Sequence, residues 1–179
     1  ETNPTVLLKG KKGTITLTLH TKQLMDLGLT QSSVYLARFA GDKVSEENEI
    51  PVSAILLPDF SGMTEQDKAL APAIRLSESK IDLSRVLVKK NKARHDIVIT
   101  NTGKSPLQIS KLQVFNPAVG VALKKTILQP GESTRLRVTV LKKNLGKKKR
   151  HLRILMITND PVQPKVEIDV KATSNESHN

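Results

Sequence analysis

The stretch Arg135-Leu136-Arg137-Val138-Thr139-Val140 alternates strictly between polar and apolar side chains. Successive side chains of a β-strand point to opposite faces, so this alternation indicates a strand with one face in a core and one in water. Lys165–Val170 and Thr14–Leu19 show the same period. The residues predicted to point inward are Ile15, Leu17, Leu19, Leu136, Val138, Val140, Val166, Ile168 and Val170.

Further strands, separated by turn residues, are predicted elsewhere in the chain. They lie at Val34–Phe39, Ile50–Leu57, Ile81–Val88, Asp96–Thr100, Leu107–Val114, Val119–Leu123 and His151–Thr158. Gly103, in the break between Asn101 and Pro106, is expected to take a positive φ. Short helices are expected at Thr21–Leu29 and Glu65–Leu70. Short strands at this spacing predict an all-β chain of immunoglobulin-like β-sandwich modules.

Composition narrows the chemistry of the core. The 179 residues include no Cys and no Trp, with three Phe and one Tyr. Disulfides, thiol catalysis and cysteine-based zinc sites are therefore excluded, and the core must be aliphatic. The sequence holds no apolar run of about 18 residues, so it is not predicted to span a membrane.

The two ends of the sequence resemble each other. Leu7…Gly10 leads into Ile15–Leu19 at the spacing with which Leu128…Gly131 leads into Leu136–Val140. A strand ending in Gly41-Asp42 or Asn159-Asp160 comes next, and then an alternating strand closes each copy. This repeat predicts a tandem arrangement with an incomplete first module.

The repeat divides the chain into four parts. Residues 1–60 form the second half of a module, about three strands, and residues 61–71 form a linker. Residues 72–173 form a complete sandwich, and residues 174–179 form a flexible tail. The missing half lies upstream in the parent protein, or else another chain or the neighbouring module covers the open edge.

Three turns carry a family resemblance. The segment Ile97–Ile109, with its Asn-Thr-Gly turn, together with Leu128–Ser133 and Ile157–Pro161, resembles Hydin-like and major-sperm-protein-like immunoglobulin domains. Bacterial envelope proteins with a domain of unknown function show the same three turns. The resemblance implies a seven-strand sandwich with a scaffolding or protein-binding role. Many bacterial members have a cysteine-rich stretch where this chain has Val114–Val119, so any metal or redox role of those cysteines is absent here.

Motifs for catalysis or cofactor binding are not found in the sequence. His20, His95, His151 and His178 have no second ligand at helical spacing. No G-x-S-x-G elbow, G-x-G-x-x-G motif, P-loop or clearly paired carboxylates occur. We therefore predict a chain that is not an enzyme and has no cofactor and no metal.

A strong positive charge is the remaining chemical feature. The net charge is +12, and the span from Lys124 to Arg153 has eleven Lys or Arg and one acid, Glu132. The candidate anion-binding residues are Lys142, Lys143, Lys147, Lys148, Lys149 and Arg150. An acidic polysaccharide fits this loop, whereas nucleic acid is disfavoured because neither stacking aromatics nor a groove-entering helix accompanies it. The alternative interpretation is a solvated loop.

These features lead to one expected function with alternatives. We expect a structural or protein-binding module of a bacterial cell-envelope or secreted protein, in the periplasm or outside the cell. Its partner would be another protein or other domains of the same protein. The first alternative is an anion-binding domain, for acidic glycan or nucleic acid, that uses the loop 142–150. A pilus-chaperone-like protein is ranked last, because that class uses two complete immunoglobulin-like domains.

Overall fold

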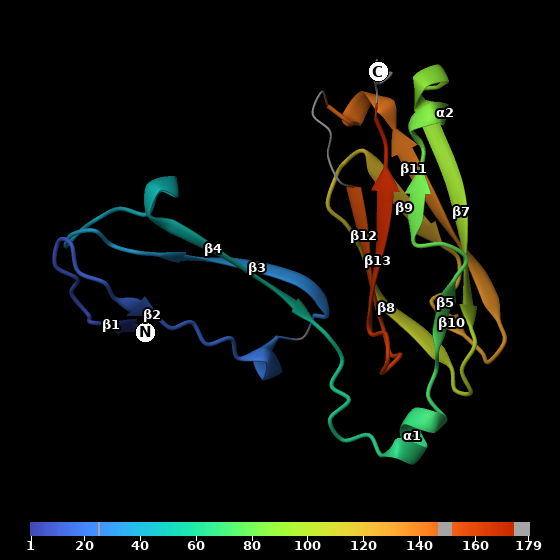
Figure 1. The fold of residues 1–179 in the computed structure, drawn as a ribbon, viewed down its shortest axis with the longest axis horizontal. Coiled ribbons are helices and arrows are strands. Elements are labelled where there is room, and N and C mark those ends of the chain that lie inside the picture. Colours follow the sequence, from blue (N-terminus) through green and yellow to red (C-terminus); the bar gives the residue numbers. More distant parts are fainter. Residues whose placement is uncertain (25, 147–151, 174–179) are drawn as a thin grey trace.

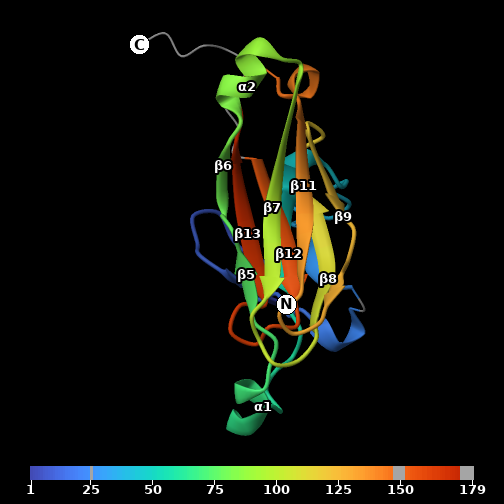
Figure 2. The ribbon, with the colours of Figure 1, turned by 90° about the vertical axis from the view of Figure 1, so that its right-hand side faces the viewer.

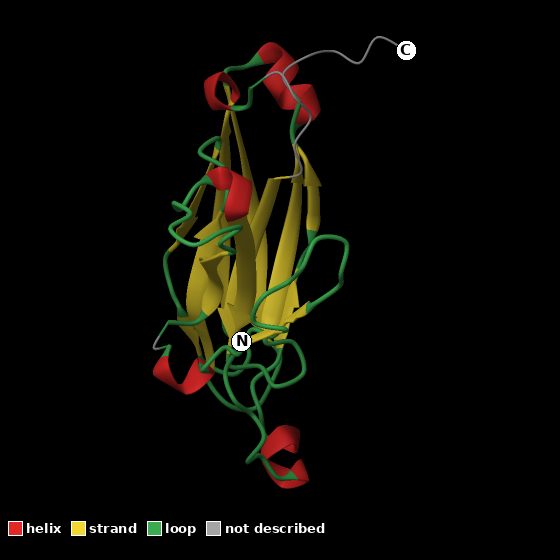
Figure 3. Cartoon of the chain, turned by 90° about the vertical axis from the view of Figure 1, so that its left-hand side faces the viewer, coloured by secondary structure: helices red, strands yellow, loops and turns green. Residues whose placement is uncertain are grey.

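A computed structural model describes residues 1–24, 26–146 and 152–173. Figure 1 shows a closed sandwich, residues 72–173, and a thin N-terminal segment, residues 1–57, that extends away from it. Strands form the body of the chain, and the short helices lie at the ends and in the loops (Figure 3). The chain is all-β with an immunoglobulin-like sandwich, as predicted.

The sandwich consists of two sheets. The first has the order β5-β7-β11-β9, and its strands are β5 (Ile74–Leu76), β7 (Lys92–Asn101), β11 (Ser133–Leu141) and β9 (Val119–Leu123). The second has the order β10-β8-β12-β13-β6, and its strands are β10 (Ile127–Leu128), β8 (Leu107–Val114), β12 (Leu152–Thr158), β13 (Lys165–Lys171) and β6 (Lys80–Asp82). All pairs are antiparallel except β6 with β13. Since β5 and β6 lie in different sheets, the chain crosses between the sheets at residues 77–79.

The alternating strands of the sandwich bury their apolar faces as predicted. Leu136, Val138 and Val140 are fully buried. Val166, Ile168 and Val170 are at most 2% exposed. Their neighbours in sequence, such as Arg135 and Glu167, lie on the solvent side. Each such side chain contributes about 1.5–3 kcal/mol when it leaves water. The core is aliphatic and is continuous between the two sheets.

The N-terminal segment is a thin, open structure. It contains β1 (Thr2–Asn3), β2 (Thr14–Ile15), β3 (Gly28–Tyr35) and β4 (Glu49–Leu56), paired as β1 with β2 and β3 with β4. Two 3-10 turns, η1 (Thr21–Gln23) and η2 (Glu46–Asn48), interrupt it. Among its described residues, Leu56 is the one hydrophobic side chain that is buried. This segment therefore has no closed core.

Helices are few in the described residues. α1 (Glu65–Ala69) is held at its start by Thr64, whose hydroxyl accepts a hydrogen bond from the Asp67 amide. This reciprocal cap agrees with the predicted helix at Glu65–Leu70. α2 (Ser84–Lys89) and the 3-10 turn η3 (Lys142–Asn144) lie together at the opposite end of the sandwich (Figure 2). No helix in the described ranges is both long and apolar enough to cross a membrane.

Four predicted elements differ from the structure. The strand predicted at Ile81–Val88 is wrong: β6 ends at Asp82, and α2 comes directly after it. The strand predicted at Val34–Phe39 is also wrong, because β3 ends at Tyr35 and Phe39 lies exposed in the next turn. Of the predicted strand Thr14–Leu19, only its first two residues pair with another strand. The helix predicted over Thr21–Leu29 is reduced to η1.

Gly103 is required for a reason other than the one predicted. Its φ is not positive, whereas Gly131 in the later turn has a φ of +78°. A Cβ on Gly103 would lie 2.4 Å from the Ala73 nitrogen and 2.5 Å from the Ala71 oxygen. The backbone that enters the sandwich therefore passes directly over this glycine.

This close approach predicts that a substitution is tolerated less well at Gly103 than at Gly131. Gly103→Ala should lower the free energy of unfolding by about 1–3 kcal/mol, since backbone must move to admit the methyl group. Gly131→Asn should be nearly neutral, because asparagine tolerates positive φ and nothing lies within 4 Å of a Cβ there. Urea unfolding followed by circular dichroism measures both. Equal tolerance at the two positions would contradict the close approach.

Candidate interaction surfaces

Asn101, of the Asn-Thr-Gly turn, is a buried structural residue. Its side-chain nitrogen donates to the carbonyl oxygens of Ser105 at 2.8 Å and Leu128 at 3.0 Å. Its oxygen accepts from the Gly103 amide at 3.0 Å and from the Ala73 amide at 3.4 Å. One amide group thus ties together three segments that are far apart in sequence. All four of its hydrogen bonds are used inside the fold, which leaves none for a ligand.

Asp160, of the Asn-Asp-Pro turn, is a second structural residue. Its carboxylate is 3% exposed and accepts three backbone hydrogen bonds, from Ile74 at 2.8 Å, Val162 at 2.8 Å and Gln163 at 3.1 Å. It therefore joins the start of β5 to the turn between β12 and β13. The residues behind the family resemblance thus stabilise the fold rather than form a site.

The predicted basic loop is described only in part. Lys142 and Lys143 lie in η3, where Lys143 is exposed and Lys142 is half-buried. Lys142 is anchored to the neighbouring strand connection: its amide donates to the Asn91 oxygen at 2.9 Å and its ammonium to the Val88 oxygen at 3.4 Å. The other predicted anion-binding residues lie outside the described residues; they are Lys147, Lys148, Lys149 and Arg150.

The fold brings further basic side chains close to η3, and the sequence alone does not reveal this proximity. β7 begins opposite the end of β11, with Lys92 paired to Leu141, so α2 and η3 lie side by side (Figures 1 and 2). We call this cluster the basic end; its described residues are Arg85, Lys89, Lys90, Lys92, Lys142 and Lys143. Residues 83–95 and 139–146 contain no Asp or Glu. The sequence shows both basic stretches, but their meeting depends on strand pairing.

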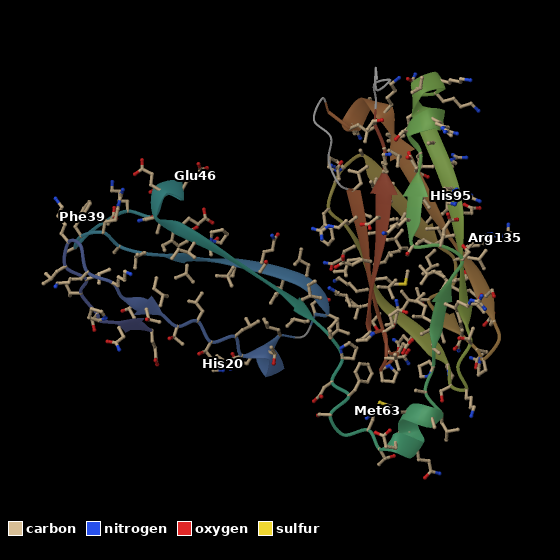
Figure 4. All side chains as sticks on the ribbon, in the orientation of Figure 1. His20, Phe39, Glu46, Met63, His95 and Arg135 are labelled. Carbon is tan, nitrogen blue, oxygen red and sulfur yellow. The ribbon has the colours of Figure 1, made fainter. Side chains whose placement is uncertain are left out.

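Elsewhere on the sandwich, several cations are paired with carboxylates. Arg137 contacts Asp96 across β11 and β7 through two hydrogen bonds, at 2.9 and 3.1 Å, which hold the pKa of Asp96 below its ordinary value. Lys125 contacts Glu132 beside Gly131, and this ion pair lowers the pKa of Glu132. Arg135 lies exposed on the same sheet face as Arg137 (Figure 4).

These lowered pKa values predict the direction of acid sensitivity. A carboxyl whose pKa is lower in the folded than in the unfolded state stabilises the fold above its unfolded pKa. That contribution is lost as pH falls through the lower, folded value. The free energy of unfolding should therefore decrease below the ordinary values of 3.8 for Asp96 and 4.5 for Glu132. The double variant Asp96→Asn with Glu132→Gln should show a shallower decrease between about pH 5 and pH 2 in urea titrations; an unchanged slope would contradict this.

The N-terminal segment exposes an unusual number of aliphatic side chains. Its exposed large hydrophobic residues are Val6, Leu7, Leu8, Ile15, Leu17, Leu19, Leu24, Tyr35, Leu36, Phe39, Val44 and Leu57. Val6 is 75% and Phe39 is 63% exposed. A cavity of about 550 Å³ opens among Val6, Leu7, Ile15, Leu36 and Phe39. Contiguous apolar surface of this kind is typical of a protein-contact site.

The hairpin of β3 and β4 contributes one apolar face to this surface. Opposite residues of an antiparallel pair share a face, so Val34 and Ile50, and likewise Gly28 and Leu56, lie on one face with Val52. In the described residues β3 pairs with β4 alone, and β4 with β3 alone. Apart from Leu29, whose backbone contacts the Gln113 side chain, the outer edges of the hairpin are thus available for strand addition. We call this apolar surface, together with the β3 edge, the open face.

One end of the hairpin contacts the sandwich. The Leu29 amide donates to the Gln113 side chain at 2.8 Å, and Lys111 forms an ion pair with Asp26 at 2.6 Å. A cleft of about 970 Å³ lies beside this contact, lined in part by Leu29, Phe115 and Leu155. The charged residues in its lining are Arg153 and Glu167, which lie 3.9 Å apart. The cleft therefore presents no catalytic pair among the described residues.

The described titratable groups form no metal cluster. His20 lies on the N-terminal segment, remote from His95 (Figure 4), and His95 contacts Glu78 at 2.6 Å. No group of three His, Asp or Glu in the described ranges could hold a metal ion. His151 and His178 lie outside the described residues.

A family model agrees with the sandwich from end to end. The model for the HYDIN/CFA65/VesB-like immunoglobulin-like domain matches residues 72–173. The chain belongs to this family. No curated protein matches the sequence. The HYDIN/CFA65/VesB-like match confirms the resemblance inferred from the three turns.

Solved structures to which the chain is similar come from bacteria and from humans. A protein of unknown function from Porphyromonas gingivalis is 26% identical with a TM-score of 0.64; the match covers 83% of this chain and 67% of that one. The VesB protease of Vibrio cholerae is 13% identical with a TM-score of 0.45, over 57% of this chain and 31% of that one. The ASH/PapD-like domain of human CEP192 is 11% identical with a TM-score of 0.47, over 65% of this chain and 93% of that one.

Proposed function

We propose that this chain is a non-enzymatic, protein-binding module of a bacterial cell-envelope or secreted protein. The sandwich acts as a rigid support, and the open face of the N-terminal segment is the contact surface. The relative of known structure with 26% identity is bacterial, which supports this setting. The periplasm or the cell exterior is the proposed location.

The observation behind this proposal is the contrast between the two parts of the chain. The sandwich buries its aliphatic faces, whereas the N-terminal segment exposes side chains of the same kind. Exposing Phe39 or Leu17 in a finished protein would be costly and would favour aggregation. A polypeptide that covers the open face removes this cost.

Photo-crosslinking tests the proposal. We would place p-benzoyl-phenylalanine at Phe39 of the full-length protein in its own cell, a conservative exchange of one aromatic side chain for another. The control places the same probe at Val162, which is 89% exposed on a loop of the sandwich. Crosslinks to polypeptide at Phe39 well above those at Val162 are expected. Equal yields at both positions would rule out a protein contact there.

A second candidate function rests on the basic end. Because α2 and η3 meet, Lys89, Lys90 and Lys143 lie together without an acidic neighbour in residues 83–95 or 139–146. Such a cluster attracts polyanions at long range. Exposed lysines suit the spaced charges of an acidic polysaccharide, and residues 83–95 and 139–146 contain no Phe, Tyr or Trp on which bases could stack.

A charge-matched pair of variants tests this candidate. Changing Lys89, Lys90 and Lys143 to Glu should weaken binding to a sulfated polysaccharide at least about tenfold, with a shallower dependence on salt. The control changes Lys9, Lys11 and Lys12 to Glu, which alters the net charge equally at an exposed site on the N-terminal segment. Equal loss in both variants would show that net charge alone retains the protein, and would exclude a site at the basic end.

A further inference from the structure

The start of the N-terminal segment repeats the geometry of two sandwich strands. β1 and β2 pair Thr2 with Ile15, and adding 121 to both numbers gives the pair Leu123 and Leu136 of β9 and β11. Gly10, between β1 and β2, has a φ of +79°, and the residue 121 positions later, Gly131, has a φ of +78°. Pairing register and turn conformation thus agree, in addition to the sequence spacing.

The equivalence extends to the hairpin that comes after each of these strands. The antiparallel hairpin of β3 and β4 comes after β2, just as the hairpin of β12 and β13 comes after β11. In the sandwich, β11 pairs with β7 as well as β9, β12 also pairs with β8, and β13 also pairs with β6. No described strand pairs with β2, β3 or β4 in the places of β7, β8 and β6.

The exposure of the side chains shows the consequence of these missing partner strands. Ile15, Leu17 and Leu19 correspond to Leu136, Val138 and Val140 under the same shift of 121. The sandwich residues are fully buried, whereas Ile15, Leu17 and Leu19 are 38%, 47% and 48% exposed. The same aliphatic alternation is thus present in both copies, but only one copy has a second sheet opposite it. The N-terminal segment therefore presents the apolar face of one sheet without the second sheet that would cover it.

Resting on the proposed function, we propose that the open face is closed by the first half of an immunoglobulin-like module on the same polypeptide. This half supplies aliphatic strands in the places of β6, β7 and β8, and its strand beside β3 extends the hairpin into a sheet. β1 takes the place of the end of β9 beside β2. In the sandwich, the half that contains β6 to β9 comes directly before the half that contains β11 to β13.

The solved relative is compatible with such an arrangement. The match to the Porphyromonas gingivalis protein covers 83% of this chain, more than the sandwich alone provides, so it includes much of the N-terminal segment. The same match covers 67% of that relative, so a third of its chain lies outside the match. That relative therefore has residues beyond the part that corresponds to this chain.

Mapping the crosslinked peptides tests the identity of the occupant. The probe is p-benzoyl-phenylalanine at Phe39 and, in a second variant, at Leu17, in the full-length protein in its own cell. Mass spectrometry identifies the attached peptide, and a denaturing gel shows whether the product keeps the mass of one chain. We expect a product of one-chain mass, with the crosslinked peptide in an alternating apolar strand outside residues 1–179.

The outcomes separate this inference from the proposed function. A crosslink to a second copy or to a different protein would overturn the same-polypeptide half-module and leave the protein-binding function standing. A crosslink from Leu17 or Phe39 back to the sandwich would also overturn the inference, because the neighbouring module would then cover the open face. Failure to exceed the Val162 control at both positions would overturn the inference and the proposed function together.

Discussion

Asn101→Ala should lower the free energy of unfolding by about 3–4 kcal/mol, because it leaves several buried groups unpaired. The change removes four hydrogen bonds, at 2.8 to 3.4 Å, and leaves the carbonyls of Ser105 and Leu128 without their donor. A buried polar group that loses its partner costs about 1–3 kcal/mol. Urea unfolding monitored by circular dichroism measures the loss.

The Asn101→Asp variant distinguishes the contribution of the hydrogen bonds to stability from that of side-chain packing. A carboxylate has nearly the same shape as the amide, but it cannot donate to the Ser105 and Leu128 carbonyls. We expect a loss at least as large as that of Asn101→Ala. If Asn101→Asp were nearly neutral, the side-chain nitrogen would not be responsible for joining the three segments.

Asp160→Ala is expected to have a similar effect, about 3 kcal/mol, for a related reason. It leaves the amides of Ile74, Val162 and Gln163 without their shared acceptor, at a position that is 3% exposed. Hydrogen bonds to a charged group contribute about 1.5–3 kcal/mol each, and relaxation of the turn recovers part of that sum. Denaturant unfolding measures this loss as well.

Asp160→Asn provides the matched control for that prediction. Its remaining oxygen can accept from one side, but its NH₂ group faces amide donors on the other. We expect about half of the loss that Asp160→Ala produces. An identical loss in the two variants would show that the stabilisation does not depend on the number of accepted hydrogen bonds.

Periodicity predicted the strands of the sandwich because both sheets cover an aliphatic core on one face. The predicted ranges Leu107–Val114 and Val119–Leu123 agree with β8 and β9. A prediction is wrong where one spacing of apolar residues fits both a strand and a helix. Leu83 and Leu87 are both buried, and a spacing of four positions fits either two strand repeats or one helical turn. In the structure the Leu87 amide donates to the Leu83 carbonyl at 3.1 Å, so both leucines enter the core from one helical turn.

The first strand of the N-terminal hairpin was predicted at the wrong place for a different reason, whereas the predicted strand Ile50–Leu57 agrees with β4. β3 reads Gly28–Tyr35 with Gln31, Ser32 and Ser33 at its centre, so its apolar period is weak. The apolar residues after it, up to Phe39, suggested a strand, but Arg38 contacts Asp42 at 2.9 Å and closes a turn there. Local charge pairing of this kind is not visible in an apolar pattern.

The interaction surfaces were only partly predictable. Lys142 and Lys143 are evident in the sequence as part of a basic stretch, but Lys89 and Lys90 join these two residues only because Lys92 pairs with Leu141. The role of Asp160 depends on Ile74, which is 86 positions away in the chain. Contacts between such distant residues depend on topology, which a single sequence specifies only after its strands have been paired.

Hydrogen exchange on residues 1–179 alone tests the central claim most directly, since the claim is that the sandwich is closed and the N-terminal segment is open. The amides of Leu136, Val138 and Val140 in β11 should exchange slowly, near the limit set by global unfolding. The equivalent amides of Leu17 and Leu19 should exchange at almost the rate of an unfolded chain. Strong protection at Leu17 and Leu19 would show that the segment already has its strand partners, and would contradict the account.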